Sequence, residues 1–276
     1  MSDRVTGADT ALWVAWHRAL ETRRPDALFR DPLAQRLAGE RGEQVARHMN
    51  RGSATRGSWT TIVRTSIIDE LLARAVGDGV DLVVNLAAGH DTRPYRLVLP
   101  SHLRWVEVDT AEVLDRKDQL LAGEEPRCTV TRLAADLRDP SHRADVLARA
   151  LQGASRALVL TEGLLVYLPE KVARELASEL HELALVRCWI TDLAAPLVRR
   201  RMHRYAHLVC EDAQWQFAPS EGVACFEPLG WRPMQVRAIV HEAARLRRLP
   251  WLLWPVALFD RDPQRPWGAV VCLQRG

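Results

Sequence analysis

Apolar residues recur at helical spacing along the first eighty positions of the chain. They fall every three or four residues from Gly7 to Glu21, and again from Ser58 to Val76, where glycines follow closely. This spacing is typical of amphipathic helices, and glycine is common directly after a helix. Asp31-Pro32 predicts the start of a further helix, with aspartate as the N-cap and proline in the first turn. The N-terminal part is therefore expected to be helical.

Beyond residue 80 the pattern changes to short apolar runs separated by helical stretches. Each run is too short for a helix and too continuous for a strand with one solvent-facing side. Such alternation is typical of a buried parallel sheet with crossover helices on both faces. The expected strands are Asp81–Leu86, Leu103–Val108, Cys128–Ala134, Ala157–Thr161 and Cys188–Thr191. The expected crossover helices are Ala111–Leu121, His142–Ala150 and Glu170–Val186.

The last third of the sequence follows neither pattern closely. Between Pro196 and Gly230 it is irregular and polar. We expect a helix from Met234 to Leu246, because apolar residues return there at helical spacing. Two further apolar segments, Pro250 to Phe259 and Trp267 to Leu273, flank an Asp- and Pro-containing turn and predict a hairpin.

The chain of 276 residues is long enough for one large domain with a cover. With 47% hydrophobic residues, disorder as the main state is excluded. The change of pattern places an N-terminal helical cap at 1–79 and an α/β domain at 80–276, with a lid insertion at 196–230. Segments outside a sheet often close over a ligand, so the cap and the insertion are expected to form the substrate side.

Charge and cysteine spacing exclude several classes of function. Thirty-eight basic against thirty-five acidic residues give +3, a balance too even to predict a nucleic-acid or anionic membrane surface. No stretch approaches the roughly 20 apolar residues of a membrane span, and no secretory signal is recognisable, so a cytoplasmic protein is expected. The five cysteines are widely spaced and never form a CxxC pair, which predicts neither a disulfide framework nor a metal site.

The first apolar run leads into a turn of small residues, where an open α/β sheet binds nucleotides. The dinucleotide fingerprint G-x-G-x-x-G is not met, because its glycine positions hold Ala87, Gly89 and Thr92. A nicotinamide cofactor is therefore disfavoured. Twenty residues further on, Glu107 and Asp109 project from the same side of the second strand, where a carboxylate accepts hydrogen bonds from a ribose; Asp109 is nearer the carboxyl edge. An adenosine without pyrophosphate fits this combination, and S-adenosylmethionine is such a ligand.

Several short motifs occur in a fixed order between residues 5 and 190. They include Leu28-Phe29-Arg30-Asp31-Pro32, Gly89-x-Asp91-Thr92-Arg93-x-Tyr95-Arg96, Glu107-Val108-Asp109, Ala135-Asp136-Leu137-Arg138-Asp139 and Glu162-Gly163-x-Leu165-x-Tyr167. In these motifs the sequence resembles the leucine carboxyl methyltransferase-like family of S-adenosylmethionine-dependent methyltransferases. Bacterial members of that family include tetracenomycin-type carboxyl O-methyltransferases of polyketide tailoring. The resemblance implies a class I methyltransferase fold, a Rossmann-like α/β architecture with a mostly parallel sheet, and S-adenosylmethionine as the cofactor.

The resemblance also implies roles for individual residues. Arg64 corresponds to the arginine that holds the methionine carboxylate of the cofactor, and a guanidinium fork suits a carboxylate well. Ala87 and Gly89 correspond to the turn that passes under the cofactor, although the family usually has glycine where this chain has Ala87. Asp109 corresponds to the ligand of the ribose.

Three further residues correspond to the rest of the cofactor site. Asp136 and Leu137 resemble the adenine pocket, where a carboxylate accepts from the exocyclic amine and an apolar neighbour covers the ring. Glu162 resembles the carboxylate that faces the cofactor ammonium, with N-capping of the following helix as its structural alternative. Loop scaffolding by caps and ion pairs is the favoured interpretation of Asp91, Arg93 and Arg96.

Transfer of a methyl group to oxygen is a direct displacement in which positioning matters most. The family resemblance implies an O-methyltransferase that forms a methyl ester on a small-molecule carboxylate in secondary metabolism. The sequence adds that no residue stands out as an obligatory base, and a carboxylate, which is ionised near neutral pH, needs none. The alternatives are a phenol or hydroxyl acceptor on an aromatic or polyketide substrate, which would want a base, and a non-catalytic interaction protein with the same fold. Candidates for the substrate pocket are Trp13, Trp16, Tyr167, Arg199, His203, Tyr205 and Trp215.

Overall fold

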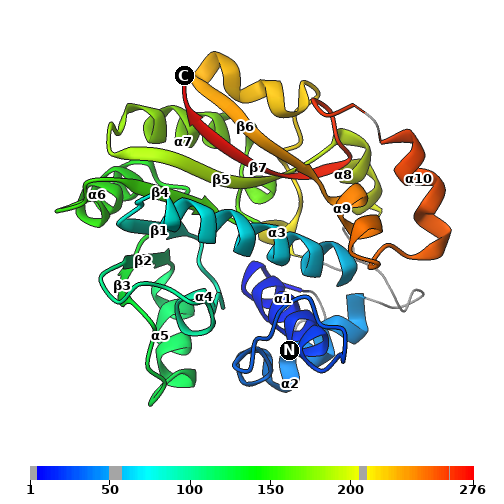
Figure 1. Ribbon diagram of the computed structural model, residues 1–276, viewed down its shortest axis with the longest axis horizontal. Helices are drawn as coiled ribbons and strands as arrows, with labels where there is room; N and C mark the ends of the chain where they lie inside the picture. The colour runs from blue at the N-terminus through cyan, green and yellow to red at the C-terminus, as the bar shows by residue number, and fades with distance from the viewer. Residues whose placement is uncertain (1–4, 50–57, 205–209, 261) are drawn as a thin grey trace.

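The computed structural model describes residues 5–49, 58–204, 210–260 and 262–276. Its strands are β1 (Leu82–Leu86), β2 (Arg104–Asp109), β3 (Thr129–Ala134), β4 (Ala157–Thr161), β5 (Val186–Ala194), β6 (Trp231–Ala238) and β7 (Gly268–Arg275). They form one sheet in the order β3-β2-β1-β4-β5-β7-β6 (Figure 1). The first five strands are parallel, and β7 runs antiparallel to both β5 and β6. The α/β fold with a mostly parallel sheet is thus confirmed.

The helices lie on both faces of this sheet and beside it (Figure 1). The α-helices are α1 (Gly7–Thr22), α2 (Ala34–Met49), α3 (Ser58–Gly77), α4 (Arg93–Arg96), α5 (Ala111–Leu120), α6 (Pro140–Ala150), α7 (Glu170–Glu182), α8 (Pro196–His203), α9 (Ile239–Arg245) and α10 (Trp254–Phe259). Short 3-10 helices are η1 (Leu165–Tyr167), η3 (Glu211–Ala213), η4 (Gly222–Leu229) and η5 (Trp251–Leu253). No helix in the described ranges is long and apolar enough to cross a membrane.

Two apolar cores lie on opposite faces of the sheet. One contains α6, α7 and η4 and includes Trp189 and Trp231, whose rings are fully buried. The other contains α3 and α9 and includes Trp105. Strands β1 and β4 are buried at every position, since helices cover both faces of a parallel sheet. This double cover explains the continuous apolar runs in the sequence.

The expected strands and crossover helices of the parallel half are confirmed, with small shifts of their ends. The C-terminal prediction is wrong in two places. The expected helix at Met234–Leu246 is strand β6 up to Ala238 and then α9, and the strand expected at Pro250–Phe259 is helical, as η5 and α10. The second strand, β7, pairs with β6 instead. Pro233 fits β6 because this strand is the edge of the sheet, where a missing backbone donor is tolerated.

The predicted N-cap at Asp31 is also wrong. Helix α2 begins at Ala34, and the Asp31 carboxylate instead accepts hydrogen bonds from Arg18 Nε at 2.9 Å and Thr92 Oγ1 at 2.6 Å. Aspartate before proline favours a cap locally, but this side chain is fully buried and its charge needs a cationic partner. Helices α1 and α2 pack together, and α1 also contacts α3. The division into a cap and an α/β domain with a lid insertion stays a prediction.

Candidate functional site

The carboxyl ends of the central strands β1, β2, β4 and β5 gather charged side chains at one edge of the sheet. Strands β2 and β3, which follow β1 in the chain, lie on one side of β1 in the sheet. The chain then crosses back, and β4 and β5 lie on the other side of β1. In doubly wound sheets this reversal opens a crevice where ligands bind. The turn after β1, Asp109 at the end of β2, Glu162 after β4 and Asp192 near the end of β5 all lie at this edge.

The turn after β1 has a backbone that favours glycine. Ala87 has φ of 56° and Gly89 has φ of 47°, both in the left-handed region. A Cβ added to Gly89 would lie 3.2 Å from the Cβ of Ala11 in α1, so this helix lies directly against the turn. Asp109 fixes the turn from the other side, because its Oδ2 accepts from Gly89 N at 2.8 Å. Its Oδ1 accepts from Thr110 N at 2.8 Å, and burial raises the pKa of Asp109.

The structure separates Asp109 from its neighbour Glu107. The Glu107 carboxylate is fully buried between Lys117 Nζ at 2.8 Å and Arg132 Nε at 2.9 Å. These contacts occupy both of its oxygens and enclose it in the protein. Glu107 is thus enclosed in the protein, and the role of Asp109 as a ligand of the ribose stays a prediction.

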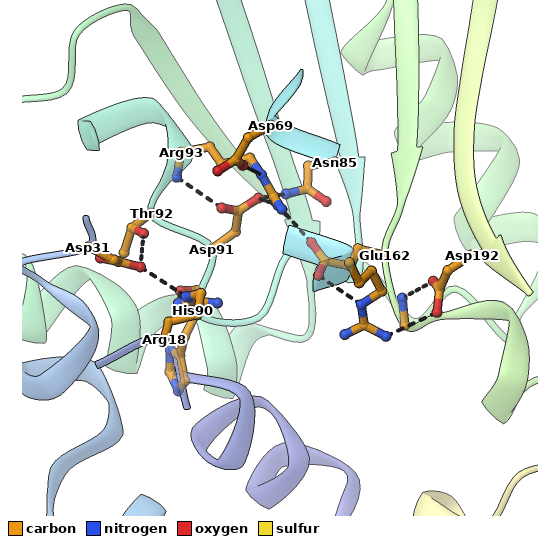
Figure 2. A network of polar contacts seen from close by, with 12 residues as sticks. Arg18, Asp31, Asp69, Asn85, His90, Asp91, Thr92, Arg93, Glu162 and Asp192 are labelled. Atoms are coloured by element: carbon orange, nitrogen blue, oxygen red, sulfur yellow. Dashed lines mark hydrogen bonds and ion pairs between the residues drawn. The ribbon is translucent and has the colours of Figure 1, made fainter. Parts of the chain in front are cut away.

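Arg64, from α3, and Glu162 are brought into direct contact. Arg64 Nε donates to Glu162 Oε1 at 3.0 Å, and Arg64 Nη1 donates to Asp192 Oδ2 at 3.0 Å. Glu162 Oε2 accepts from Arg93 Nη1 at 2.7 Å (Figure 2). Burial alone would raise the pKa of Glu162, but the guanidinium groups of Arg93 and Arg64 hold it below its usual value. The Glu162 carboxylate is thus ionised and held between two cations.

Arg93 extends this network into the turn. Its Nη1 also contacts Asp91 at 2.8 Å, and its Nε donates to Asp69 of α3 at 2.7 Å. Arg96 Nη1 reaches the same Asp69 carboxylate at 2.7 Å, while Asn85 Nδ2 donates to Asp91 at 2.8 Å. Asp91, Arg93 and Arg96 thus form ion pairs with one another, with α3 and with Glu162, which agrees with their interpretation as scaffolding.

The N-terminal helices are tied to the same turn. Arg18 of α1 donates to the carbonyl oxygen of His90 at 2.5 Å and forms the buried ion pair with Asp31 (Figure 2). Thr92 in the turn donates to the same Asp31 carboxylate. The His90 ring is buried, and this burial lowers its pKa to about 3. Polar contacts therefore join α1, the segment before α2 and the turn into one unit.

Asp136 and Leu137 follow β3, at the same edge of the sheet. The Asp136 carboxylate is half-exposed and pairs with Arg138 at 2.9 Å. Leu137 is buried in the core, and its carbonyl accepts from Arg143 at 3.0 Å. Within the described residues, no hydrogen bond or ion pair joins these two to Arg64, Asp109 or Glu162. Their assignment to an adenine pocket stays a prediction.

Several pocket candidates meet around one segment of the predicted lid. Arg199 Nη1 donates to the carbonyl of Gln216 at 2.6 Å, and His203 Nε2 lies 3.0 Å from the carbonyl of Trp215. A ring nitrogen that faces a carbonyl must carry the proton, so this nitrogen is a donor. Gln216 Nε2 in turn donates to the carbonyl of Tyr167 at 3.0 Å. The structure therefore places α8 and residues 215–217 against η1, which follows Glu162.

The two candidate tryptophans of α1 point to different surroundings. Trp13 packs edge-to-face on His17, with ring centroids 4.7 Å apart, next to η3. Trp16 packs against the α2 side and lies 5.8 Å from the guanidinium of Arg23. Trp13 thus packs with residues of both α2 and the predicted lid, and Trp16 packs with residues of α2. Tyr205 lies outside the described residues.

The sequence analysis missed Asp69 and Asp192. Asp192 was detectable, because it is a carboxylate near the carboxyl end of an apolar strand, the same signal that identified Asp109. Asp69 lies within a long helix and had no comparable signal. Its contact with Arg93 joins positions 24 residues apart and is set by the tertiary fold.

Comparison with known proteins identifies the family. The family model described as leucine carboxyl methyltransferase matches residues 11–181, more than half of the chain. A Frankia alni protein named as an S-adenosyl-L-methionine-dependent methyltransferase is 35% identical over 81% of this chain and 82% of its own length. A similarly named Streptomyces avermitilis protein is 38% identical over 62% of this chain and 63% of its own. The chain therefore belongs to the leucine carboxyl methyltransferase family, as the resemblance implied.

Solved structures share the fold at low sequence identity. A DUF574-family protein from Streptomyces avermitilis has a TM-score of 0.63 at 13% identity, with 97% of both chains covered. A Thermobifida fusca protein described as a methyltransferase has a TM-score of 0.62 at 17% identity, covering 99% of this chain and 96% of that one. These likenesses confirm the class I methyltransferase fold.

The protein is thus an S-adenosylmethionine-dependent methyltransferase, and the chemistry of its site fits that cofactor. Asp109 accepts one hydrogen bond at each oxygen, which leaves lone pairs for a ribose diol. Arg64 Nη2 makes no hydrogen bond to any described residue, so a donor for a carboxylate remains. Glu162 supplies a negative charge that complements an ammonium group.

Proposed function

We propose that this methyltransferase transfers a methyl group to the oxygen of a small-molecule carboxylate, forming a methyl ester in secondary metabolism. The supporting observation is that the buried histidines near the turn and in α1 are poor bases. Burial lowers the pKa of His90 to about 3 and that of His17 to about 4. A carboxylate is already ionised at neutral pH and needs no such base, whereas a phenol has a pKa near 10.

We also propose how this chain holds the cofactor, which supplies an electrophilic methyl group on a sulfonium. Arg64 donates from Nη2 to the methionine carboxylate, Glu162 accepts from the ammonium group, and Asp109 accepts from the ribose. The backbone at Ala87 and Gly89 passes beneath it. Asp136 and Leu137 form the adenine end of the site. The support for Arg64 and Glu162 is their direct contact, which places a cation and an anion where an amino acid carries opposite charges.

The remaining task of the protein is to orient the acceptor and exclude water. Helix α1 lies against the turn and covers it, while residues 215–217 lie against η1. An anionic acceptor and a sulfonium lose charge together in the transition state, so a dry site favours their reaction. Burial raises the pKa of Tyr167, which keeps its hydroxyl protonated. We propose that this hydroxyl donates a hydrogen bond to the acceptor carboxylate.

The experiment that tests this function uses S-adenosylmethionine with a labelled methyl group and a panel of aromatic carboxylic acids and phenols. We expect label on the acids, released as methanol by mild alkali, and a rate nearly flat from about pH 6 upward, because an unperturbed carboxyl has a pKa near 4. Label that survives alkali, with a rate that rises around pH 6.5, would instead establish the phenol acceptor. Cofactor binding without turnover on either class would favour a non-catalytic role.

The cofactor placement has its own test in titration calorimetry. Arg64→Ala and Asp109→Ala should each weaken S-adenosylmethionine binding by roughly 1–3 kcal/mol, the range for a lost hydrogen bond to a charged group. Asp81→Ala is the control, because this carboxylate accepts from Ser155 N and Arg156 N ahead of β1, at the opposite edge of the sheet. Wild-type affinity in the Arg64 and Asp109 variants would remove both residues from the site.

A further inference from the structure

Asp192 bridges three elements at the edge of the site. It lies near the carboxyl end of β5 and is 7% exposed. Its Oδ1 accepts from the backbone N–H of Gly163, in the turn after β4, at 2.6 Å. Its Oδ2 accepts from Nη1 of Arg64, on α3, at 3.0 Å (Figure 2). One carboxylate thus sets the distance between the Arg64 guanidinium and the turn that carries Glu162.

These contacts determine how Arg64 presents its remaining donors. A guanidinium is planar and rigid, so fixing two of its nitrogens fixes the direction of the third. Nε is held by Glu162 and Nη1 by Asp192, which leaves Nη2 as the edge open to a ligand. Gly163 lies beside that edge, since a Cβ there would be 3.6 Å from both Nη1 and Nη2. Glycine at this place keeps the approach to Nη2 free of a side chain.

We infer that Asp192 is a positioning residue, which aims the Arg64 fork at the methionine carboxylate of the cofactor. The inference rests on the placement of Arg64 proposed above. Asp192 acts through Arg64 in this arrangement, because its two oxygens are directed at Gly163 N and Arg64 Nη1. Its effect on binding is therefore limited to ligands that carry the amino-acid part of the cofactor.

The test compares three ligands by titration calorimetry: S-adenosylmethionine, S-adenosylhomocysteine and 5′-methylthioadenosine. The last keeps the adenosine and the thioether but lacks the amino-acid carboxylate. In Asp192→Asn one of the two acceptor oxygens becomes an NH2 donor, so either Gly163 N or Arg64 Nη1 then faces a donor and loses its hydrogen bond. We expect the variant to bind the first two ligands roughly 10- to 100-fold more weakly, the range for a lost charge-assisted hydrogen bond. Methylthioadenosine affinity should change less than about twofold.

The matched control is Asp81→Asn. Asp81 also uses both carboxylate oxygens, accepting from Ser155 N and Arg156 N at 2.8 Å each, but it precedes β1 at the opposite edge of the sheet. All three affinities should stay at the wild-type level in this variant. Urea unfolding of both variants checks that each is folded under the conditions of the titration.

A double-mutant cycle separates the inference from the placement of Arg64. Once Arg64→Ala has removed the fork, Asp192→Asn should weaken S-adenosylmethionine binding no further, since coupled residues are not additive. Equal weakening of all three ligands by Asp192→Asn would show a general structural role and overturn the inference. So would an unchanged S-adenosylmethionine affinity in Asp192→Asn while Arg64→Ala still weakens it. Wild-type affinity in Arg64→Ala would overturn the proposed placement and the inference together.

Discussion

Gly89→Ala tests whether α1 packs on the turn after β1. The substitution places a methyl group on a backbone with φ of 47°, where an L-residue costs about 1–2 kcal/mol. Alanine recovers about 0.4–1 kcal/mol of this by restricting the unfolded chain. The new Cβ would also lie 3.2 Å from the Cβ of Ala11, so α1 or the turn must move by a few tenths of an ångström. We expect a total loss of about 1–2 kcal/mol in the free energy of unfolding, with the contact supplying about half.

A control variant, Gly79→Ala, measures the cost of the left-handed backbone alone. Gly79 also has a left-handed backbone, with φ of 91°, but a Cβ there meets nothing within 4 Å. Gly79→Ala should therefore cost only the strain, about 0.5–1 kcal/mol. In an Ala11→Gly background the contact with position 89 is absent, and Gly89→Ala should then cost no more than Gly79→Ala.

Urea unfolding monitored by tryptophan fluorescence measures the wild type and the four variants, with one common denaturant dependence of the free energy (m-value) fitted to the series. The difference between Gly89→Ala in the two backgrounds is the coupling energy of the helix and the turn. Equal costs at positions 79 and 89, with no coupling to Ala11, would refute the packing of α1 on the turn. The proposed exclusion of water by α1 would then lose its support.

Two further predictions concern buried charges. Lys117→Met should lower the free energy of unfolding by about 3 kcal/mol, because the fully buried Glu107 carboxylate would keep only Arg132 as a cationic partner; a loss below about 1 kcal/mol in urea unfolding would contradict the buried pair. Burial lowers the pKa of His17 to about 4, so the unfolded chain binds the extra proton first and stability falls as pH drops below about 6.5. The share of the loss that comes from His17 between pH 7 and pH 5 should be about 2 kcal/mol, and His17→Phe should remove that share of the pH dependence.

The parallel half of the fold is predictable because its signals are local. Continuous apolar runs identify buried strands wherever helices cover both faces of a sheet, as at β1 and β4. The place of Asp109 at the carboxyl end of β2, beside the turn after β1, followed from the same pattern, and its role as a ligand stays a prediction. Glu107 instead forms a buried ion pair with Lys117, ten residues further on, and this contact is visible only in the folded chain.

The expected helix at Met234–Leu246 is wrong because no residue pattern marks the boundary between β6 and α9. Strand β6 ends at Ala238 and α9 begins at Ile239, with no glycine or polar turn between them. The helix expected from Met234 therefore included residues 234–238, which belong to β6. The prediction of an N-cap at Asp31 is wrong for another reason. The local preference of aspartate as a cap is outweighed by its buried ion pair with Arg18, thirteen residues earlier. The neighbouring residues in the sequence do not distinguish a strand followed by a helix from one helix, or a helix cap from a buried ion pair.

The motifs shared with the family act mostly as a framework for the turn, and less as ligands. Arg18 holds the His90 carbonyl, Thr92 holds Asp31, and Arg93 joins Asp91 to Glu162 (Figure 2). Buried ion pairs contribute little net stability, because desolvation offsets their attraction, but a pair that loses one partner is costly. Such a network therefore allows few arrangements of the turn relative to α1. The place of the proposed cofactor site is thereby fixed by the N-terminal helices as well as by the sheet, so a change in α1 should reach the site without touching a ligand.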